Sequence, residues 1–248
     1  MYILGDVGNT DTKLFLVNSR NKILKKKTFT TKNISLKKLS IIFKYLVVDF
    51  NNIKKILFCS VVPDSFKIIK NFLSKKTQIK CYEVKSLNLR SLLKIQVNYH
   101  QVGSDRIVNA ISLKNNNDNF IILDFGTATT FDVLIKDTYK GGIIAPGIKL
   151  SLNTLTDRAS LIPQINLNKI KKVIGVDTIS AVRSGFFWGY VGLINNLIDL
   201  IKKETGKSFK IVFTGGLSNL FKNSIKAKVK YNKEITVKGL IKISKLIK

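Results

Sequence analysis

Near its start the chain reads Ile3-Leu4-Gly5-Asp6-Val7-Gly8-Asn9-Thr10-Asp11-Thr12-Lys13-Leu14-Phe15-Leu16. A related stretch stands near the middle: Ile121-Ile122-Leu123-Asp124-Phe125-Gly126-Thr127-Ala128-Thr129-Thr130-Phe131-Asp132-Val133-Leu134. Asp6 aligns with Asp124, and Gly8 aligns with Gly126. Each copy is an apolar run, an Asp-x-Gly turn with hydroxyl or amide residues, and a second apolar run, which predicts a β-hairpin. The repeat therefore indicates a duplicated fold.

Strands and helices follow the two hairpins in a similar order. In the first half, the pattern predicts strands at 23–30, 56–62 and 79–84 and helices at 36–46 and 66–73. In the second half, it predicts a strand at 209–213 and helices at 150–155, 178–203 and 239–247. This order predicts two α/β domains with mixed sheets, 1–115 and 116–248. Because no Ser- or Pro-rich linker separates them, we expect the two halves to pack tightly with a cleft between them.

The charge of the chain is strongly positive. Its 43 Lys and Arg against 15 Asp and Glu give a formal net charge of +28, which first suggests a nucleic-acid or membrane surface. The lysines are scattered, however, and are interleaved with Asn and Ile, a texture typical of A/T-rich coding. No recognition module accompanies the charge. We therefore expect no specific nucleic-acid partner, although a nucleic-acid-binding protein remains an alternative.

Hydropathy and cysteine usage indicate a cytoplasmic protein. No stretch reaches the roughly 18 uninterrupted apolar residues of a membrane span, and the start of the chain carries no targeting signal. Cys59 and Cys81 stand within apolar, strand-like runs without metal-ligand spacing. We expect no disulfide between the two cysteines, which fits a reducing compartment. From the hydropathy, we expect no membrane partner.

The two Asp-x-Gly turns are candidates for phosphate binding. A glycine-bearing turn exposes backbone N–H groups, and Asn9, Thr10 and Thr12 add side-chain donors that can cradle phosphate oxygens. Asp6 can hold a phosphate-bound cation, and Lys13 can add a positive charge. Taken alone, one such turn reads as an ordinary hairpin. Its duplication around Asp124 favours phosphate binding over two coincidental hairpins.

A second candidate is the segment Gly103-Ser104-Asp105-Arg106, which opens an apolar helical period. Ser104 or Asp105 at a helix start can simply cap the helix. Asp105 can also accept a proton from a substrate hydroxyl while Arg106 binds an anionic group of the same substrate. The only histidine, His100, lies in a loop and is interpreted as solvated.

The segment from Thr178 is unusually apolar. Its large side chains include Phe186, Phe187, Trp188, Tyr190, Val191, Leu193, Ile194, Leu197, Ile198 and Ile201. These cover more than one stripe of a surface helix, so they predict either a helix buried in its own domain or a subunit interface. Thr178 stands at the start, where its hydroxyl can cap the helix or contact a ligand.

These motifs, in this order, resemble the type III pantothenate kinase family. The matching pieces are Asp6-Val-Gly-Asn-Thr, Gly103-Ser-Asp-Arg106, Asp124-Phe-Gly-Thr-Ala-Thr-Thr, Gly141-Gly-Ile-Ile-Ala-Pro-Gly147, Gly175-Val-Asp-Thr-Ile-Ser-Ala-Val-Arg-Ser-Gly185 and Thr214-Gly-Gly216. The resemblance implies a two-domain actin-like ATPase (ribonuclease H-like) fold. It also implies a homodimer that phosphorylates pantothenate with ATP and Mg²⁺, the first step of coenzyme A synthesis, and needs K⁺ or NH₄⁺.

The resemblance also implies roles for individual residues. The ATP phosphate loop corresponds to Asp6, Val7, Gly8, Asn9, Thr10, Asp11, Thr12 and Lys13, with Thr127 a further nucleotide contact. Gly103, Ser104, Asp105 and Arg106 correspond to the pantothenate segment, with Asp105 as the catalytic base. Asp124 corresponds to the monovalent-cation ligand, and Thr178 to a threonine that reaches the substrate near the dimer interface.

The chain departs from the family pattern just before Gly103. Family members often carry a tyrosine and then Asn-Pro, whereas this chain has Gln96 at the tyrosine position and Tyr99 at the proline position. No substrate contact is therefore carried over to either residue. Two further alternatives stay open: a kinase for a different acyl or sugar substrate, and a regulatory role of the Bvg accessory factor type, which predicts binding without turnover.

Overall fold

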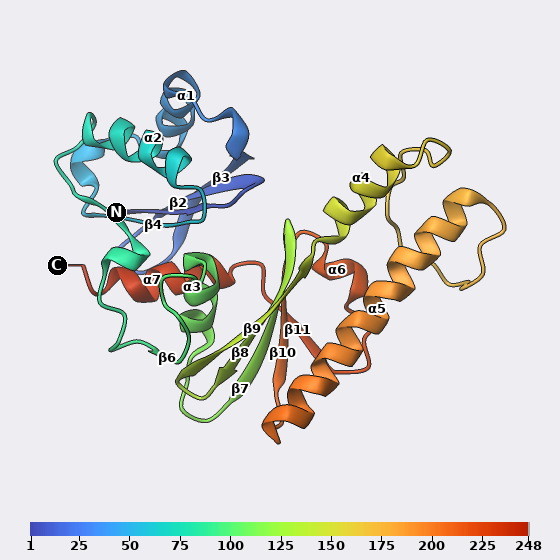
Figure 1. The fold of residues 1–248 in the computed structure, drawn as a ribbon. Coiled ribbons are helices and arrows are strands. Elements are labelled where there is room, and N and C mark those ends of the chain that lie inside the picture. Colours follow the sequence, from blue (N-terminus) through green and yellow to red (C-terminus); the bar gives the residue numbers. More distant parts are fainter. Residues whose placement is uncertain (248) are drawn as a thin grey trace. The chain divides into compact units, whose positions relative to one another are not determined.

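The computed structural model describes residues 1–247, which divide into two compact units (Figure 1). Unit 1 comprises Met1–Lys114, Asp137–Tyr139 and the chain from Glu234 onward; unit 2 comprises Asn115–Lys136 and Lys140–Lys233. The first boundary lies next to the one expected from sequence at residue 115. The C-terminal segment, however, lies with unit 1 and not with the second half of the chain.

Unit 1 contains a five-stranded mixed sheet in the order β3-β2-β1-β4-β5. Its strands are β1 (Tyr2–Val7), β2 (Asp11–Val17), β3 (Ile23–Thr30), β4 (Lys55–Ser60) and β5 (Cys81–Glu83), and its helices are α1 (Leu36–Leu46), α2 (Pro63–Ser74), α3 (Ser104–Leu113) and α7 (Ile235–Ser244), with short 3-10 turns η1 (Thr31–Asn33), η2 (Phe50–Asn52) and η3 (Val84–Ser86). The predicted hairpin β1–β2 is antiparallel, whereas β1 pairs with β4 in parallel.

The central strand β1 is apolar on both faces because helices cover both sides of the sheet. On one side, Phe43 of α1 stacks on Phe72 of α2 with ring centroids 5.3 Å apart. On the other, α3 and α7 lie side by side (Figure 1). The backbone of α7 approaches α3 so closely that a Cβ at Gly239 would collide with the carbonyl of Val108. Glycine therefore permits this helix contact.

Unit 2 repeats the strand order of unit 1 in a mixed sheet ordered β11-β10-β7-β8-β9-β6. Its elements are β7 (Asn119–Phe125), β8 (Ala128–Ile135), β9 (Thr138–Pro146), α4 (Ile148–Arg158), α5 (Thr178–Thr205), β10 (Lys210–Gly215), α6 (Ser218–Phe221) and β11 (Val229–Tyr231). The short β6 (Lys94–Ile95) and the first two residues of β9, with which it pairs, belong to unit 1. The hairpin β7–β8 is antiparallel and β7–β10 is parallel, as for β1–β2 and β1–β4. The duplication predicted from the repeated motif is thus confirmed.

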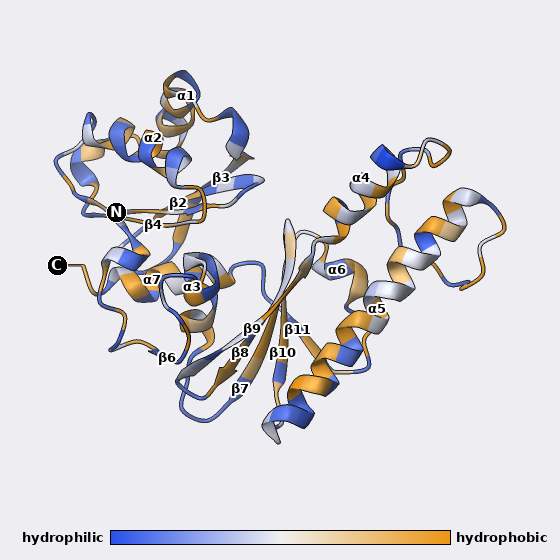
Figure 2. Ribbon diagram, in the orientation of Figure 1, coloured by the Kyte–Doolittle hydropathy of each residue, from blue (hydrophilic) through white to orange (hydrophobic). Residues whose placement is uncertain are grey.

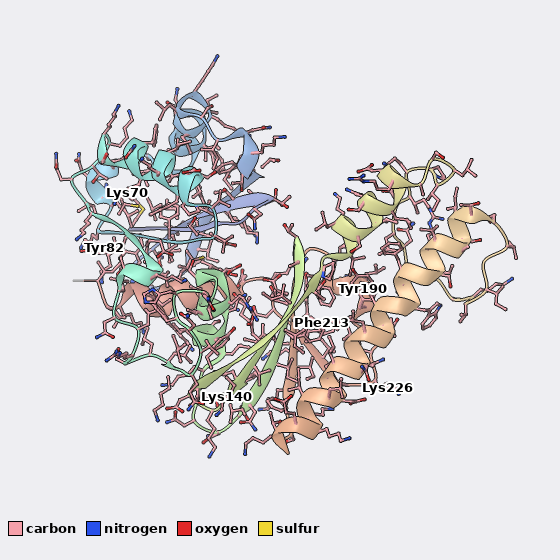
Figure 3. All side chains as sticks on the ribbon, in the orientation of Figure 1. Lys70, Tyr82, Lys140, Tyr190, Phe213 and Lys226 are labelled. Atoms are coloured by element: carbon pink, nitrogen blue, oxygen red, sulfur yellow. The ribbon has the colours of Figure 1, made fainter. Side chains whose placement is uncertain are left out.

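The core of unit 2 lies between its sheet and α5. One stripe of α5 is buried: Ser184, Phe187, Val191, Ile194, Ile198 and Ile201. Figure 2 shows the strands β7 and β10 as largely hydrophobic, in keeping with this core. Tyr190 of α5 and Phe213 of β10, labelled in Figure 3, both belong to the same apolar cluster. The helix α5 therefore packs in the core of its own unit. This is one of the two interpretations that the apolar sequence allowed, the other being a subunit interface.

Some predicted boundaries shift. The strand expected at 56–62 ends at Ser60 because Pro63 begins α2, where a proline is tolerated at the first position. The last helix begins at Ile235, four residues before the expected start, since Ile235 and Val237 are buried. Within residues 1–247, none of the helices combines the length and the apolar character that a membrane crossing needs.

Candidate active site

The first glycine turn connects β1 to β2 and carries Asp6 at its base. Asp6 is 8% exposed, and its Oδ2 lies 3.3 Å from Lys13 Nζ, so the two residues form an ion pair across the hairpin. Lys13 stands opposite Asp6 because the antiparallel register pairs the two positions. The turn itself closes through the Gly8 N–H, which donates to the Asp11 carbonyl over 3.1 Å.

Thr31 supports this turn and was missed by the sequence reasoning. Its hydroxyl donates to the Gly8 carbonyl over 2.7 Å, and its N–H donates to the Thr10 carbonyl over 2.9 Å. Its Oγ1 also lies 2.9 Å from that of Thr12. Thr31 is buried in η1, beyond β3, so its role depends on the strand pairing and has no signal in the local sequence. These bonds fix the carbonyls of the turn.

Cys59 of β4 lies among three carboxylates of unit 1. Its thiol donates to the Gly5 carbonyl over 3.7 Å and to Asp6 Oδ1 over 3.6 Å. Burial raises the pKa of the Cys59 thiol well above its usual value, and the negative charges of Asp6, Asp105 and Glu83 raise the pKa further. Strand β4 thus brings the first turn and the Asp105 segment into one electrostatic neighbourhood.

The segment from Gly103 to Arg106 forms the start of α3, as the sequence predicts. Ser104 is 1% exposed; its hydroxyl accepts from the Ser60 N–H over 2.9 Å and donates to the Ser60 carbonyl over 3.0 Å. The Arg106 N–H donates to Asp105 Oδ1 over 2.9 Å, and a Cβ at Gly103 would collide with that same oxygen. The Ser104 side chain therefore ties α3 to β4, while glycine leaves room for the Asp105 carboxylate.

The second glycine turn, between β7 and β8, lies in unit 2. The Gly126 N–H donates to the Ala128 carbonyl over 3.0 Å, which repeats the bond at Gly8. Gly215 at the end of β10 has φ 87°, and a Cβ there would lie 2.6 Å from Asp124 Oδ1. Only glycine tolerates that backbone conformation without strain. The predicted Thr214-Gly215-Gly216 turn thus packs directly against Asp124.

Thr178 is exposed at the first position of α5. The helix cap is Asp177, whose Oδ1 accepts from the Ser180 N–H over 2.8 Å. Of the two roles left open for Thr178, capping and ligand contact, the capping role therefore belongs to Asp177. The Ser180 N–H and hydroxyl lower the pKa of Asp177, because both favour the charged form. The Thr178 hydroxyl is thus not needed for the cap.

The structure distributes the predicted residues between the two units. Unit 1 holds the ATP-loop segment 6–13 and the segment 103–106; unit 2 holds Asp124, Thr127 and Thr178. Across residues 1–247, no three His, Cys, Asp or Glu side chains gather as a metal-binding group. Cys59 and Cys81 are both free, as predicted, and His100 is exposed.

The family model for type III pantothenate kinase matches residues 2–200. A type III pantothenate kinase from Pelagibacter ubique is 62% identical over 248 residues, which is 100% of both chains. The match therefore includes both units.

Two solved structures share the fold. A conserved protein from Campylobacter jejuni, assigned to the Baf family of transcriptional activators, has a TM-score of 0.62 at 21% identity and covers 98% of this chain and 97% of its own. A protein from Sinorhizobium meliloti, assigned as a 2-dehydro-3-deoxygalactonokinase, has a TM-score of 0.64 at 9% identity, with 100% and 99% covered. These likenesses agree with the expected actin-like ATPase fold of two mixed sheets. The family model and the full-length match in sequence establish that the chain belongs to the type III pantothenate kinase family.

Proposed function

We propose that this chain is an ATP-dependent kinase that phosphorylates the primary hydroxyl of pantothenate, the first step of coenzyme A biosynthesis. The observation that carries the proposal is the start of α3, where Asp105 and Arg106 follow one another in the unit that also holds the Asp6 turn. Family membership supports the substrate assignment.

The first turn binds the phosphates of ATP. The backbone of residues 8–10 is held by Thr31, so its N–H groups are ordered before the nucleotide arrives, which lowers the entropic cost of binding. Lys13 brings a positive charge beside Asp6. Mg²⁺ would accompany the phosphates and neutralise part of their charge, with the Asp6 carboxylate as the residue of this turn able to hold it.

Asp105 acts as the general base. The γ-phosphoryl group leaves the bridging oxygen of ADP and bonds to the pantothenate hydroxyl oxygen, whose proton passes to the Asp105 carboxylate. Arg106 binds an anionic group of the substrate and so sets the direction of attack. Phosphoryl transfer depends mainly on positioning and electrostatics. The hydrogen bonds between Ser104 and Ser60, which fix the position of residues 103–106, therefore contribute to the reaction together with the Asp105 carboxylate and the Arg106 guanidinium.

Asp124 holds the monovalent cation. Its carboxylate lies against Gly215, in a space that a side chain at that position would fill, and carboxylate oxygens are hard donors suited to K⁺. When bound, the cation neutralises phosphate charge near the second turn. Thr127 in the same turn contacts the nucleotide.

The chain acts as a homodimer in the cytoplasm, and Thr178 completes the substrate pocket of the partner subunit. An apolar hollow of about 440 Å³ lies along α4 and α5, lined by Pro146, Leu155, Val182, Gly185, Phe186, Gly189, Tyr190 and Leu193. This surface is distinct from the buried stripe of α5, which packs in its own unit. Leu161, which follows α4 in the chain, and Ile174, which precedes α5, are 91% and 83% exposed. Such an apolar face is typical of a subunit interface.

A coupled assay for ADP release with ATP and pantothenate, with and without K⁺, tests the proposal. Turnover that depends on pantothenate supports it; ATP binding without turnover would instead favour a regulatory role, which the Baf-family likeness keeps as a second candidate. A panel of other hydroxyl substrates, including sugars, tests the substrate class in the same assay.

A further inference from the structure

Thr31 is a buried threonine beneath the first glycine turn, and its hydroxyl group connects that turn to Thr12. Thr31 is the first residue of η1, directly after β3. The chain reaches this point because β3 pairs with β2 in a register that places Thr30 opposite Asp11 (Figure 1). Thr12 and Thr31 are 0% and 3% exposed, so both hydroxyl groups depend on hydrogen-bond partners within the protein.

The direction of the hydrogen bond between the two threonines follows from the hydrogens that they carry. The Thr31 hydroxyl donates its only hydrogen to the Gly8 carbonyl over 2.7 Å, because a carbonyl oxygen accepts and does not donate. The Oγ1 atoms of Thr12 and Thr31 lie 2.9 Å apart. The hydrogen between these two oxygens must therefore come from Thr12. The bonds run in one direction, from Thr12 to Thr31 and from Thr31 to Gly8.

This direction changes the role that the motif alone suggested for Thr12. From the sequence, the Thr12 hydroxyl was a candidate donor to phosphate. In the structure its hydrogen is used by Thr31, and its side chain is fully buried. Any effect of the Thr12 hydroxyl on a bound nucleotide must therefore pass through Thr31 and the backbone of the turn.

Thr31 also fixes the orientation of two peptide planes of the turn. Its hydroxyl holds the Gly8 carbonyl, and its N–H donates to the Thr10 carbonyl over 2.9 Å. Both peptide bonds are trans, so the N–H on the other edge of each plane points away from Thr31. These N–H groups belong to Asn9 and Asp11, which are both exposed. Backbone N–H groups gathered in a turn form a concavity that binds anions.

We propose that Thr12 and Thr31 are positioning residues for ATP binding, because their hydroxyl groups hold the Gly8 carbonyl on the inner side of the first turn. The backbone N–H groups of Asn9 and Asp11 are thereby directed to the phosphate chain of the nucleotide. The inference rests on the proposed function of this turn as the ATP phosphate loop. Without the Thr31 hydroxyl, the plane between Gly8 and Asn9 can rotate, since glycine has no Cβ to restrict it, and a carbonyl oxygen would then face the phosphates.

The experiment compares Thr31→Val, Thr31→Ser and Thr12→Val in the full-length protein. Valine has the shape of threonine without the hydroxyl, and serine keeps the hydroxyl without the methyl group. Thr28→Val, at an exposed position of β3, is the matched control. Thermal melting establishes that each variant is folded at the temperature of the binding and kinetic measurements.

Calorimetry with ATP and Mg²⁺ gives the first readout. Thr31→Val should bind ATP about 10-fold more weakly than the wild type, because the Gly8 carbonyl loses its partner. Thr12→Val should lose less, since the Thr31 hydroxyl keeps its bond to Gly8. Thr31→Ser and Thr28→Val should bind ATP as the wild type does.

Adenosine gives a readout that separates positioning from a merely structural role. It carries no phosphates, so its affinity, measured as an inhibition constant against ATP, should be the same in all variants. In Thr31→Val, KM for ATP should rise while KM for pantothenate changes little, because Ser104 and Ser60 hold α3 by separate bonds. Equal losses of ATP and adenosine affinity, wild-type ATP affinity in Thr31→Val, or a serine variant as impaired as valine would overturn the proposal.

The double variant Thr12→Val with Thr31→Val tests the route of the effect. If Thr12 acts through Thr31, the double variant should bind ATP as Thr31→Val alone does. If the two losses add, Thr12 contacts the nucleotide by itself, and its role as a positioning residue is refuted. A wild type that binds ATP without phosphorylating pantothenate would refute the proposed kinase activity alone, because the ATP and adenosine affinities that decide this inference are measured without pantothenate.

Discussion

Cys59 and Asp6 are direct neighbours on two parallel strands, and the Cys59 thiol donates to Asp6 Oδ1 over 3.6 Å. The other oxygen of Asp6, Oδ2, pairs with Lys13. The carboxylate at the base of the first turn is thus held from both sides, by β4 and by β2. This arrangement fixes the Asp6 side chain without a ligand and keeps the thiol protonated.

The first prediction concerns the reactivity of the two thiols. Burial raises the pKa of Cys59 well above its usual value and raises the pKa of Cys81 to about 12, so both thiols stay protonated at pH 8. Because the thiolate is the reactive form, iodoacetamide at pH 8 should leave both unmodified in the native protein, measured by mass spectrometry. The same reagent in urea should modify both. Rapid labelling of native Cys59 would contradict the packing described.

The second prediction concerns Asp105. Asp105→Asn keeps the shape of the side chain and removes the proton acceptor, so kcat should fall about 10²–10⁴-fold. ATP binding, measured by calorimetry, should remain, because the first turn is held by separate contacts with Thr31. Near-normal turnover would reduce Asp105 to a structural residue at the start of α3.

The third prediction concerns the cation. Potassium or ammonium should activate the enzyme relative to sodium, and Asp124→Asn should weaken that activation by raising the K⁺ concentration required. The measurement is the initial rate against K⁺ at constant ionic strength. Asp118→Asn, which removes a carboxylate paired with Lys210 on the same unit, is the control and should leave the K⁺ dependence unchanged. Equal rates in sodium and potassium would refute the role of Asp124.

The fourth prediction concerns stability against pH. The pKa of Glu83 is raised in the folded protein above its usual value of 4.5, so folding favours the protonated acid. The contribution of Glu83 to stability is therefore fully present below pH 4.5 and is lost as pH rises through the folded pKa. Glutamine does not titrate, so Glu83→Gln should not lose stability in this pH range. The denaturation midpoint of the variant should therefore rise relative to that of the wild type as pH rises. A difference that does not change with pH would argue against a shifted acid at this position.

The fifth prediction concerns the dimer. Sedimentation should give twice the 27.9 kDa mass of one chain. Asp105→Asn and Thr178→Val subunits, each inactive alone, should recover about a quarter of wild-type activity when mixed and allowed to exchange, because half of the dimers are mixed and each has one intact pocket. An active monomer would refute the dimer, and failure to recover would confine Thr178 to its own subunit.

The sequence by itself determined the duplication, the two glycine turns and the start of α3. These are local features: the apolar runs around Asp6 and Asp124 select hairpins by their pattern, and the glycines mark where the backbone turns. The same locality explains why the strand Ile23–Thr30 and the helix at 36–46 were predicted at their observed bounds.

The tertiary structure decided which distant residues support these features. Thr31 beneath the first turn, Cys59 beside Asp6, and the bond between Ser104 and Ser60 each join residues from different elements. It likewise placed α7 with unit 1, where Gly239 permits contact with Val108. Such contacts depend on strand register and helix packing, which arise from the whole chain, so no short stretch of sequence encodes them.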